Sequence, residues 1–522
     1  MRAKHLFLAI SVVQLFLFAF CSRAVAADSG NLSEKDKDTT TVNSATAPKA
    51  EKSVTTHKLT IGGESIPFTA TAGTLIIRND KDLPYASMGY IAYVRSNVTD
   101  ISHRPITFAY NGGPGSCSVW LHMGALGGKR IVTGDTSFIP PAPYKLVDNE
   151  FSILDKTDII MIDAIGTGFS HAVGEAKDKD FWSVDPDIES FARFIKQYIT
   201  DNGRWNSPKY LLGESYGTTR SAGVVDYLQS REYMSFNGLI LISMATDLEL
   251  LFDDMPGYHW PSVFSLPTYT AIAWYHKMLP DPPADIDLLL KEVRTFALGE
   301  YSNALAQGNA LPVPTRKAII EKLHRYTGLS IDYLDKANMR VTSAQFANQL
   351  MREHGKTVGM LDGRFLGVNF NPLGKSAEYD PMDAATTSAF VASFLDYLQR
   401  DLKFSPDRTY VFDANVFATW DYRHKAGNYE LPQPLANTGI DLAHAMGFNP
   451  NLRVLVLQGT FDLGSVFLAT EYMISHLDLQ DDLRSHIRIE YYEAGHEMYT
   501  HEPSLKKLKS DVAAFFDQTK KP

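Results

Sequence analysis

Short apolar runs, each followed by a glycine-bearing or polar turn, constrain the fold of this chain more than any other feature. They occur at residues 105–110, 158–162, 209–212, 239–242, 452–457 and 487–492. Continuous apolar runs of this length are typical of strands that are buried on both faces of a parallel sheet. Because helix-length segments such as residues 185–200 separate the runs, the sequence predicts an α/β fold with a mostly parallel central sheet.

A long stretch between the fourth and fifth runs has a different character. It carries amphipathic helix patterns at residues 286–305, 316–326, 344–354 and 384–402 and few strand signals. We therefore expect residues 248–404 to form a helical insertion, or cap, and residues 57–247 and 405–522 to form the core. Alternating apolar patterns between His57 and Arg95 predict antiparallel hairpins at the start of that core.

The first residues predict export. Basic residues precede the charge-free apolar run Leu6–Phe20, and residues 24–26 (Ala-Val-Ala) have the small side chains that a signal peptidase requires. Because a bilayer span needs about 20 residues, we expect residues 1–26 to be a cleaved signal peptide of a periplasmic or secreted protein. An uncleaved anchor is the alternative.

Residues 27–56 are mostly small, polar or charged, which predicts a flexible linker. No later apolar run is long enough to span a membrane.

Charge, cysteine content and histidine spacing exclude several classes of partner and site. The chain has 50 Lys and Arg against 60 Asp and Glu, a net charge of -10, so neither nucleic acid nor an anionic membrane is expected as the main partner. Removal of the signal peptide leaves Cys117 without a second cysteine, which excludes an intramolecular disulfide. His496 and His501 are five residues apart, whereas the zinc motif H-E-x-x-H needs four. We expect no metal and no cofactor.

A G-x-S-x-G pattern follows the run at 209–212. It reads Gly213-Glu-Ser215-Tyr-Gly217 and precedes a plausible helix. A sharp turn between a strand and a helix exposes a serine hydroxyl where a base can reach it. The pattern alone is common by chance, so its position between strand and helix carries the prediction that Ser215 is a nucleophile.

An acid and a histidine follow later strands in the order that such a serine needs. Asp462 lies in a turn after the run at 452–457, and His496 follows the run at 487–492. Hydrolases with this turn have their triad in the order Ser, Asp or Glu, His. A turn-forming Asp and a structural His are the alternatives, but the joint order favours a Ser215, Asp462, His496 triad.

The glycine-rich loop after the first run is a candidate oxyanion hole. Residues 110–115 read Tyr-Asn-Gly-Gly-Pro-Gly. Glycines let backbone N–H groups approach a substrate oxygen without obstruction by Cβ. We expect the amides of Gly113 and Tyr216 to bind the oxyanion, with a plain Pro-Gly turn as the alternative.

Four motifs taken together resemble the serine carboxypeptidase family, peptidase family S10. They are Asn-Gly-Gly-Pro-Gly at 111–115, Gly-Glu-Ser-Tyr-Gly at 213–217, Gly-Thr-Phe-Asp at 459–462 and Ala-Gly-His at 494–496. The similarity extends over about residues 57–515. It implies an α/β-hydrolase fold and removal of single residues from peptide C-termini, with Ser215, Asp462 and His496 as the triad.

The resemblance also implies a receptor for the substrate's terminal carboxylate. Asn111 and Glu214 match residues that hydrogen-bond this group in the family, and Gly112 completes the predicted substrate-binding set. Glu214 and a carboxylate can approach only by sharing a proton, because two bare carboxylates repel each other. Peptidase activity is therefore expected to favour acidic pH.

Two departures from the family pattern affect this site. The family commonly has a second glutamate at the position of Ala125, so the carboxylate receptor looks incomplete. Glu497 follows the histidine where the family usually has an apolar residue, and a carboxylate there is expected to raise the pKa of His496.

The sequence thus predicts an exported serine carboxypeptidase that acts on peptides through an acyl-enzyme. An esterase, an acyltransferase or a peptidase of another specificity with the same triad is the nearest alternative, because fold and triad do not determine the substrate. A catalytically silent relative that binds peptides is the alternative of another class.

Overall fold

The computed structural model describes residues 49–253, 255, 257–427 and 429–519. A sheet of ten strands organises this part of the chain, in the order β1-β2-β3-β7-β4-β9-β10-β13-β14 with β8 paired to β3. Its strands are β1 (Lys52–Ile61), β2 (Glu64–Arg78), β3 (Pro84–Arg95), β4 (Ile106–Tyr110), β7 (Asp158–Ile162), β8 (His171–Ala172), β9 (Lys209–Glu214), β10 (Gly238–Ile242), β13 (Arg453–Gly459) and β14 (Ile487–Tyr492).

Six neighbouring strands, from β7 to β14, are parallel to one another. All six coincide with the apolar runs of the sequence. The first three strands form an antiparallel meander at one edge of the sheet. The predicted α/β fold with a mostly parallel sheet is confirmed.

The parallel strands are apolar on both faces because helices cover both faces. Side chains alternate along β10, where Leu239 and Leu241 join one core cluster while Ile240 and Ile242 join the other. The first cluster contains residues of α2 (Val184–Asp201), α3 (Tyr216–Glu232), α11 (Gly439–Phe448) and α12 (Phe467–Ser475). The second contains residues of α1 (Val119–Leu121), α10 (Pro381–Arg400) and α14 (Glu502–Thr519). A short helix, α13 (Asp481–Arg484), precedes β14.

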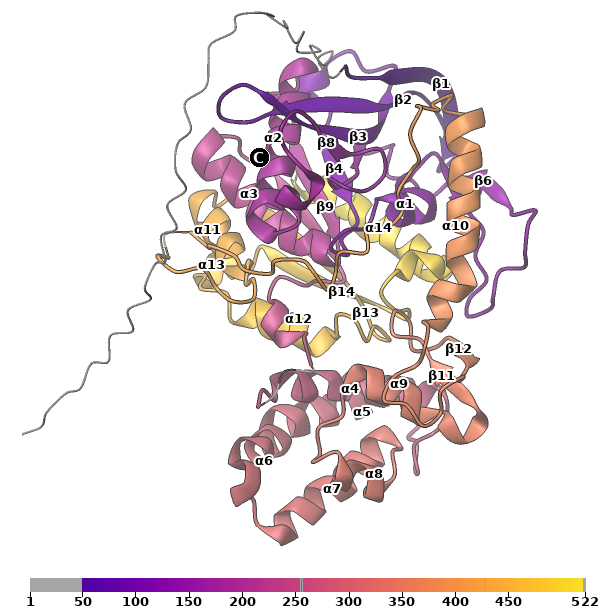
Figure 1. The fold of residues 1–522 in the computed structure, drawn as a ribbon, viewed down its shortest axis with the longest axis vertical. Coiled ribbons are helices and arrows are strands. Elements are labelled where there is room, and N and C mark those ends of the chain that lie inside the picture. Colours follow the sequence, from indigo (N-terminus) through magenta and orange to yellow (C-terminus); the bar gives the residue numbers. More distant parts are fainter. Residues whose placement is uncertain (1–48, 254, 256, 428, 520–522) are drawn as a thin grey trace, which may run out of the picture. The chain divides into compact units, whose positions relative to one another are not determined.

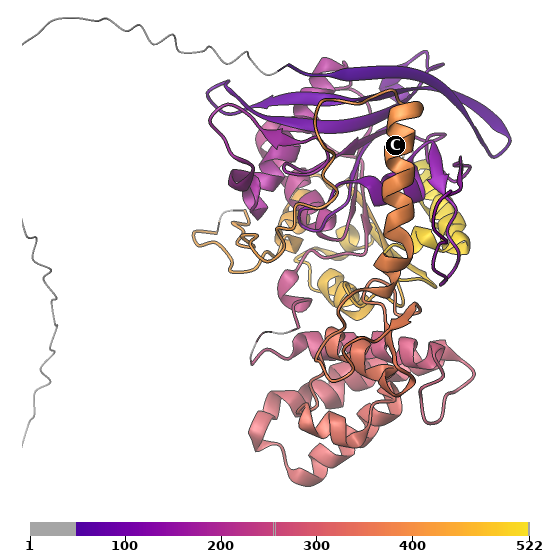
Figure 2. The same cartoon turned by 45° about the vertical axis from the view of Figure 1, so that its right-hand side comes forward.

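Most of the remaining helices belong to the stretch predicted as an insertion. They are α4 (Trp260–Tyr275), α5 (Ile286–Phe296), α6 (Ser302–Gln307), α7 (Val313–Thr327), α8 (Ile331–Lys336) and α9 (Ser343–Leu350). Figures 1 and 2 both show them grouped together beyond the ends of β13 and β14. Two small hairpins, β5 (Lys129–Ile131) with β6 (Leu146–Asp148) and β11 (Lys356–Val358) with β12 (Leu366–Val368), lie outside the main sheet.

The segment 248–404 differs from a purely helical cap in two respects. It includes the hairpin of β11 and β12. Its last helix, α10, turns back to the core, where Phe390, Phe394 and Tyr397 belong to the same buried cluster as strand residues of β7 and β9. None of the helices among the described residues is long and apolar enough to cross a membrane.

The predicted linker over 27–56 is wrong for its last five residues. β1 begins at Lys52 and pairs with β2 from Lys52↔Gly73 to Ile61↔Glu64. Most side chains at its start are at least partly exposed, so the strand is held there by backbone pairing with β2 rather than by burial. The rest of the linker up to residue 48 and the predicted signal peptide 1–26 lie outside the described residues.

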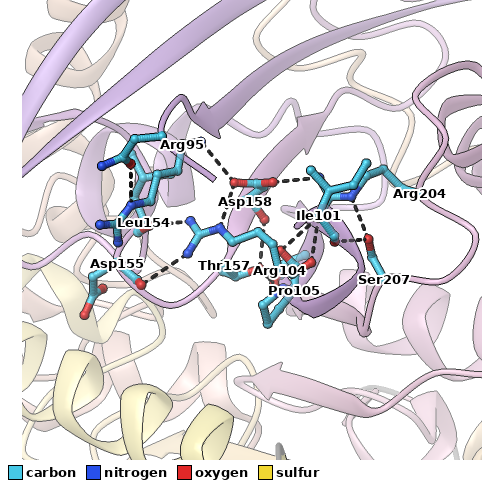
Figure 3. A network of polar contacts seen from close by, with 12 residues as sticks. Arg95, Ile101, Arg104, Pro105, Leu154, Asp155, Thr157, Asp158, Arg204 and Ser207 are labelled. Atoms are coloured by element: carbon cyan, nitrogen blue, oxygen red, sulfur yellow. Dashed lines mark hydrogen bonds and ion pairs between the residues drawn. The ribbon is translucent and has the colours of Figure 1, made fainter. Parts of the chain in front are cut away.

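A buried ionic network joins the amino-terminal ends of the strands, opposite the edge that carries the predicted site (Figure 3). Asp158 at the start of β7 is 1% exposed and accepts hydrogen bonds from Arg104 Nε at 3.0 Å and Arg204 Nη1 at 2.6 Å. The Arg95 backbone N–H donates to the same carboxylate at 3.1 Å. Arg104 also donates to the carbonyl of Leu154. One carboxylate therefore balances two buried cations.

We predict that Asp158→Asn lowers the free energy of unfolding by about 3–5 kcal/mol, because two buried guanidinium groups lose their counter-ion. Urea denaturation of purified protein measures the change. Asp148→Asn is the matched control, since its ion pair with Lys129 is exposed and is expected to contribute less than about 1 kcal/mol. Equal effects of the two substitutions would contradict the prediction.

Candidate active site

Four loops that follow parallel strands meet at one edge of the sheet. The loop after β4 carries residues 111–115, β9 ends directly before Ser215, and the loops after β13 and β14 carry Asp462 and His496. Because the strands are parallel, their carboxyl ends converge there. Residues that are hundreds of positions apart in the sequence are therefore brought to one place.

Ser215 occupies a strained turn between β9 and α3. Its φ of 58° and ψ of -129° lie in a region that a residue with a Cβ rarely adopts. The Ser215 N–H donates to the carbonyl of Ile242 at 2.9 Å, which anchors the turn to the neighbouring strand β10. This geometry is the exposed-serine turn that the sequence predicts.

The glycine-rich loop packs directly against the start of α3. A Cβ placed on Gly112 would lie 2.5 Å from the Tyr216 backbone nitrogen and 2.6 Å from that of Gly217, so only glycine fits there. Gly113, at φ 102°, follows in a conformation that also favours glycine. The two amides predicted for the oxyanion hole, of Gly113 and Tyr216, thus belong to segments in close contact.

His496 is held by Asp462 in the manner of an oriented base. Its Nδ1 lies 2.8 Å from Asp462 Oδ2, and Asp462 is fully buried. The carboxylate also accepts from the backbone N–H of Gly464 and from both the N–H and the hydroxyl of Ser465. With Nδ1 donating to Asp462, Nε2 is the ring atom left for a substrate or nucleophile.

Ser215, His496, Gly113 and Tyr216 line one pocket of about 380 Å³. Among the described residues, no hydrogen bond joins the Ser215 hydroxyl to His496. Much of the remaining wall is apolar, from Leu248, Leu251, Phe252, Met360, Leu361, Phe417, Tyr422 and Leu463. The structure thus gathers the four residues around a cavity suited to a substrate with an apolar group.

The predicted carboxylate-binding residues are bonded to each other. Asn111 Nδ2 donates to Glu214 Oε1 at 2.7 Å, and the Tyr499 hydroxyl donates to the same oxygen at 3.3 Å. Glu214 Oε2 is buried and has no hydrogen-bond partner among the described residues. Ala125, which stands where a second glutamate is expected, is 1% exposed in a turn of residues 122–126. Glu214 therefore keeps one oxygen available for a ligand or a proton.

Arg220 is a positioning residue that the sequence analysis missed. It is 0% exposed, donates to Asp187 through Nε at 2.8 Å and Nη2 at 3.2 Å, and donates through Nη1 to the carbonyl of Asn111 at 2.8 Å. One cation thus connects α2, α3 and the loop after β4. Arg220 lies five residues after Ser215, on the predicted helix. A lone arginine in a helical pattern is normally exposed, so nothing in the sequence indicates that this one is buried.

The segment after β11 supports the loops of Asp462 and His496. The His496 N–H donates to the carbonyl of Leu361 at 2.6 Å, and the Gly495 N–H donates to Asp362 Oδ2 at 2.9 Å. The Leu463 N–H donates to the carbonyl of Met360 at 3.0 Å. Residues from the predicted insertion therefore hold the loops that carry Asp462 and His496, which no sequence motif indicates.

The ionisable groups of the site interact strongly. Burial raises the pKa of Glu214 to about 7, against the lowering effects of His496 and of the hydrogen bonds from Tyr499 and Asn111. Burial alone would lower the pKa of His496, but Asp462 and then Glu214 stabilise the imidazolium and raise its pKa to about 9. Glu497 is not among the groups that shift the pKa of His496 most, although the sequence suggested such an effect.

We predict that Glu214→Gln lowers the pKa of His496, because the substitution removes a negative charge that stabilises the imidazolium. Histidine-labelled protein titrated by NMR measures the pKa independently of any activity. Glu493→Gln, an acid in the same loop as His496, is the control and should leave the titration unchanged. An unchanged His496 pKa in Glu214→Gln would show that the two groups are not coupled.

Part of the chain is similar in sequence to a known family, and the fold as a whole is similar to solved structures. Residues 65–251 match the family model of serine carboxypeptidases, a stretch that includes Asn111, Gly113, Glu214 and Ser215 but neither Asp462 nor His496. None of the curated proteins compared with the chain matches it.

Two solved structures are similar to this chain at low sequence identity. One is Kex1(delta)p, a prohormone-processing carboxypeptidase from Saccharomyces cerevisiae, with 15% identity and a TM-score of 0.53 over 86% of this chain and 91% of that chain. Another is a proline iminopeptidase from Mycobacterium smegmatis, with 13% identity and a TM-score of 0.36 over 86% of this chain and 98% of that chain. The chain has the α/β-hydrolase fold, and its residues 65–251 resemble those of serine carboxypeptidases.

Proposed function

We propose that this protein is a serine carboxypeptidase that is exported through the predicted signal peptide 1–26. The observation that carries the proposal is the meeting of Ser215, the bonded pair of His496 and Asp462, and the bonded pair of Asn111 and Glu214 at one sheet edge. A nucleophile, an oriented base and a carboxylate receptor are the groups that cleavage next to a free C-terminus requires. The family match over residues 65–251 supports the same activity.

In the proposed reaction, the Ser215 hydroxyl attacks the carbonyl carbon of the last peptide bond and His496 Nε2 accepts its proton. The negative oxygen that forms accepts hydrogen bonds from the N–H groups of Gly113 and Tyr216. His496 then donates the proton to the departing amine, which leaves an acyl group on Ser215. A water molecule, deprotonated by His496, releases the acyl group and restores the serine.

Asp462 stabilises the imidazolium that forms during each proton transfer. It is fully buried and accepts four hydrogen bonds, counting those from His496, Gly464 and the two from Ser465, so its position beside the imidazole is fixed. Its contact with Nδ1 selects the tautomer whose Nε2 faces the reaction.

Glu214 gives the proposed specificity for a free C-terminus. A protonated Glu214 donates a hydrogen bond to the substrate's carboxylate, whereas an ionised one repels it. Its pKa of about 7 means that the receptor is in its binding form at acidic pH. The apolar pocket beside Ser215 is suited to an apolar substrate side chain.

An esterase or acyltransferase is the second candidate, and Ala125 is the observation that favours it. A buried methyl group takes the place of the second glutamate that the family resemblance leads one to expect. The same triad then acts on an acyl substrate without regard to a terminal carboxylate.

We predict that Ser215→Ala lowers kcat by at least about 10⁴-fold on peptide and ester substrates and abolishes labelling by a fluorophosphonate probe. Ser230→Ala, on the helix α3 that follows Ser215, is the control and should retain both. Among the described residues, the hydroxyl of Ser230 donates to the Asp226 carbonyl alone. A Ser215→Ala protein that keeps most of its turnover would exclude Ser215 as the nucleophile.

We also predict that the preference for a free C-terminus depends on pH. At pH 5–6, kcat/KM should be higher for blocked dipeptides that end in a free acid than for the corresponding amides and esters. The quantity to follow is the ratio of kcat/KM for the free acid to kcat/KM for the ester. Because Glu214 loses its proton near pH 7, this ratio should fall by roughly tenfold per pH unit well above about pH 7. A ratio near one at every pH would favour the esterase alternative.

A further inference from the structure

Glu497 is a buried carboxyl group that the proposed reaction does not use. It directly follows His496 and is 8% exposed. Its backbone carbonyl accepts hydrogen bonds from the N–H and the hydroxyl of Thr500, which fixes the turn on which it stands. Among the described residues, no hydrogen bond reaches its side chain. The carboxyl group therefore takes no part in holding the turn, and a ligand could use it.

Glu214, at the end of β9, is the charged group with the largest electrostatic effect on Glu497. Burial raises the pKa of Glu497 well above its usual range, and Glu214 contributes the largest electrostatic addition. Tyr499, two residues further along the same turn, donates to Glu214 Oε1 at 3.3 Å and feels the charges of both glutamates. The turn 497–499 therefore contacts Glu214 through the Tyr499 hydroxyl, and Glu497 stands two residues earlier on the same turn. The second oxygen of Glu214 is buried and has no hydrogen-bond partner among the described residues.

Small residues opposite this turn make its approach possible. A Cβ on Gly124 would lie 2.3 Å from Cδ2 of Tyr499, so the tyrosine ring packs against the backbone at Gly124. The next residue, Ala125, has only a methyl group. The segment that lacks the expected acid is thus the segment against which Tyr499 packs.

We propose that Glu497 supplies the second carboxyl group of the receptor for the substrate's terminal carboxylate, paired with Glu214 and replacing the acid absent at Ala125. The inference rests on the proposed carboxypeptidase function. Each protonated glutamate donates one O–H hydrogen bond to an oxygen of the bound carboxylate, so the negative charge is stabilised by two hydrogen bonds and no proton is transferred. Asn111 and Tyr499 both donate to Glu214 Oε1, which leaves Oε2 to carry the proton.

Burial and the negative charges of neighbouring acids favour the protonated form of Glu497. A neutral form is favoured because burial and like charges both oppose ionisation. The titratable groups that face the two glutamates are His496 and Tyr499 on the same turn, Asp462 after β13, and Asp380 and Asp383 at the start of α10. His496 is the one cationic group among these, and it belongs to the reacting centre.

The test compares Glu497→Ala and the near-isosteric Glu497→Gln on blocked dipeptides that end in a free acid, an amide or an ester. Glu497→Ala should lower kcat/KM for the free acid by about 10- to 100-fold, mainly through KM, and leave the ester within about twofold. Glu497→Gln should retain most of the free-acid rate at pH 5–6, because an amide N–H also donates. Above pH 7, Glu497→Gln should retain a larger share of its free-acid rate than the wild-type enzyme does, because the amide group donates a hydrogen bond without taking up a proton.

Glu493→Gln is the control variant and should behave like wild type on all three substrates. Equal losses on free acid and ester in both Glu497 variants would overturn the proposal, since they would indicate a packing role. A loss confined to substrates with a C-terminal Lys or Arg would also overturn it, because an ionised Glu497 would then be binding a cation. A wild-type enzyme that ignores the free carboxylate would instead refute the proposed function, which separates that failure from a failure of Glu497 alone.

Discussion

The ion pair of Arg220 and Asp187 is the interaction on which the geometry of the site depends. Arg220 is completely buried, its guanidinium lies 4.1 Å from the ring centroid of Phe191, and it donates to the carbonyl of Asn111. Removing one partner of such a pair leaves an uncompensated charge in the interior, so the pair resists separation. Because α2, α3 and the loop after β4 meet at this cation, the strained turn of Ser215 and the amides beside it cannot move independently.

The sheet was predictable from sequence, and the residues of the proposed triad could be located there, because both depend on local patterns. Strands buried on both faces appear as continuous apolar runs, so all six parallel strands could be recognised without an alignment. Ser215, Asp462 and His496 follow strand ends, and parallel strands bring those ends together whatever lies between them. The structure adds the bond of His496 to Asp462 and the common pocket, which sequence order alone does not establish.

What could not be predicted depends on partners distant in sequence. The start of β1 has a linker-like composition, but β2 supplies backbone partners for it. Helix α4 contains Pro267 and is buried on all sides from Pro261 to Ala273, so it lacks the amphipathic pattern that reveals a helix. Arg220 and the contact of Leu361 with the His496 backbone depend on tertiary packing. The role proposed for Glu497 depends on the contact of its turn with Glu214 through Tyr499, which no sequence pattern indicates.

Because Glu214 and His496 interact electrostatically, the protonation of Glu214 affects both the binding of the substrate carboxylate and the ability of His496 to accept a proton. When Glu214 is ionised, it repels a substrate carboxylate and also stabilises the imidazolium of His496, which then cannot accept the serine proton. When Glu214 takes up a proton, below about pH 7, the receptor becomes a donor and the pKa of His496 falls toward the working pH. Binding of the correct substrate favours the protonated form of Glu214. The group that recognises the free C-terminus therefore also prepares the base.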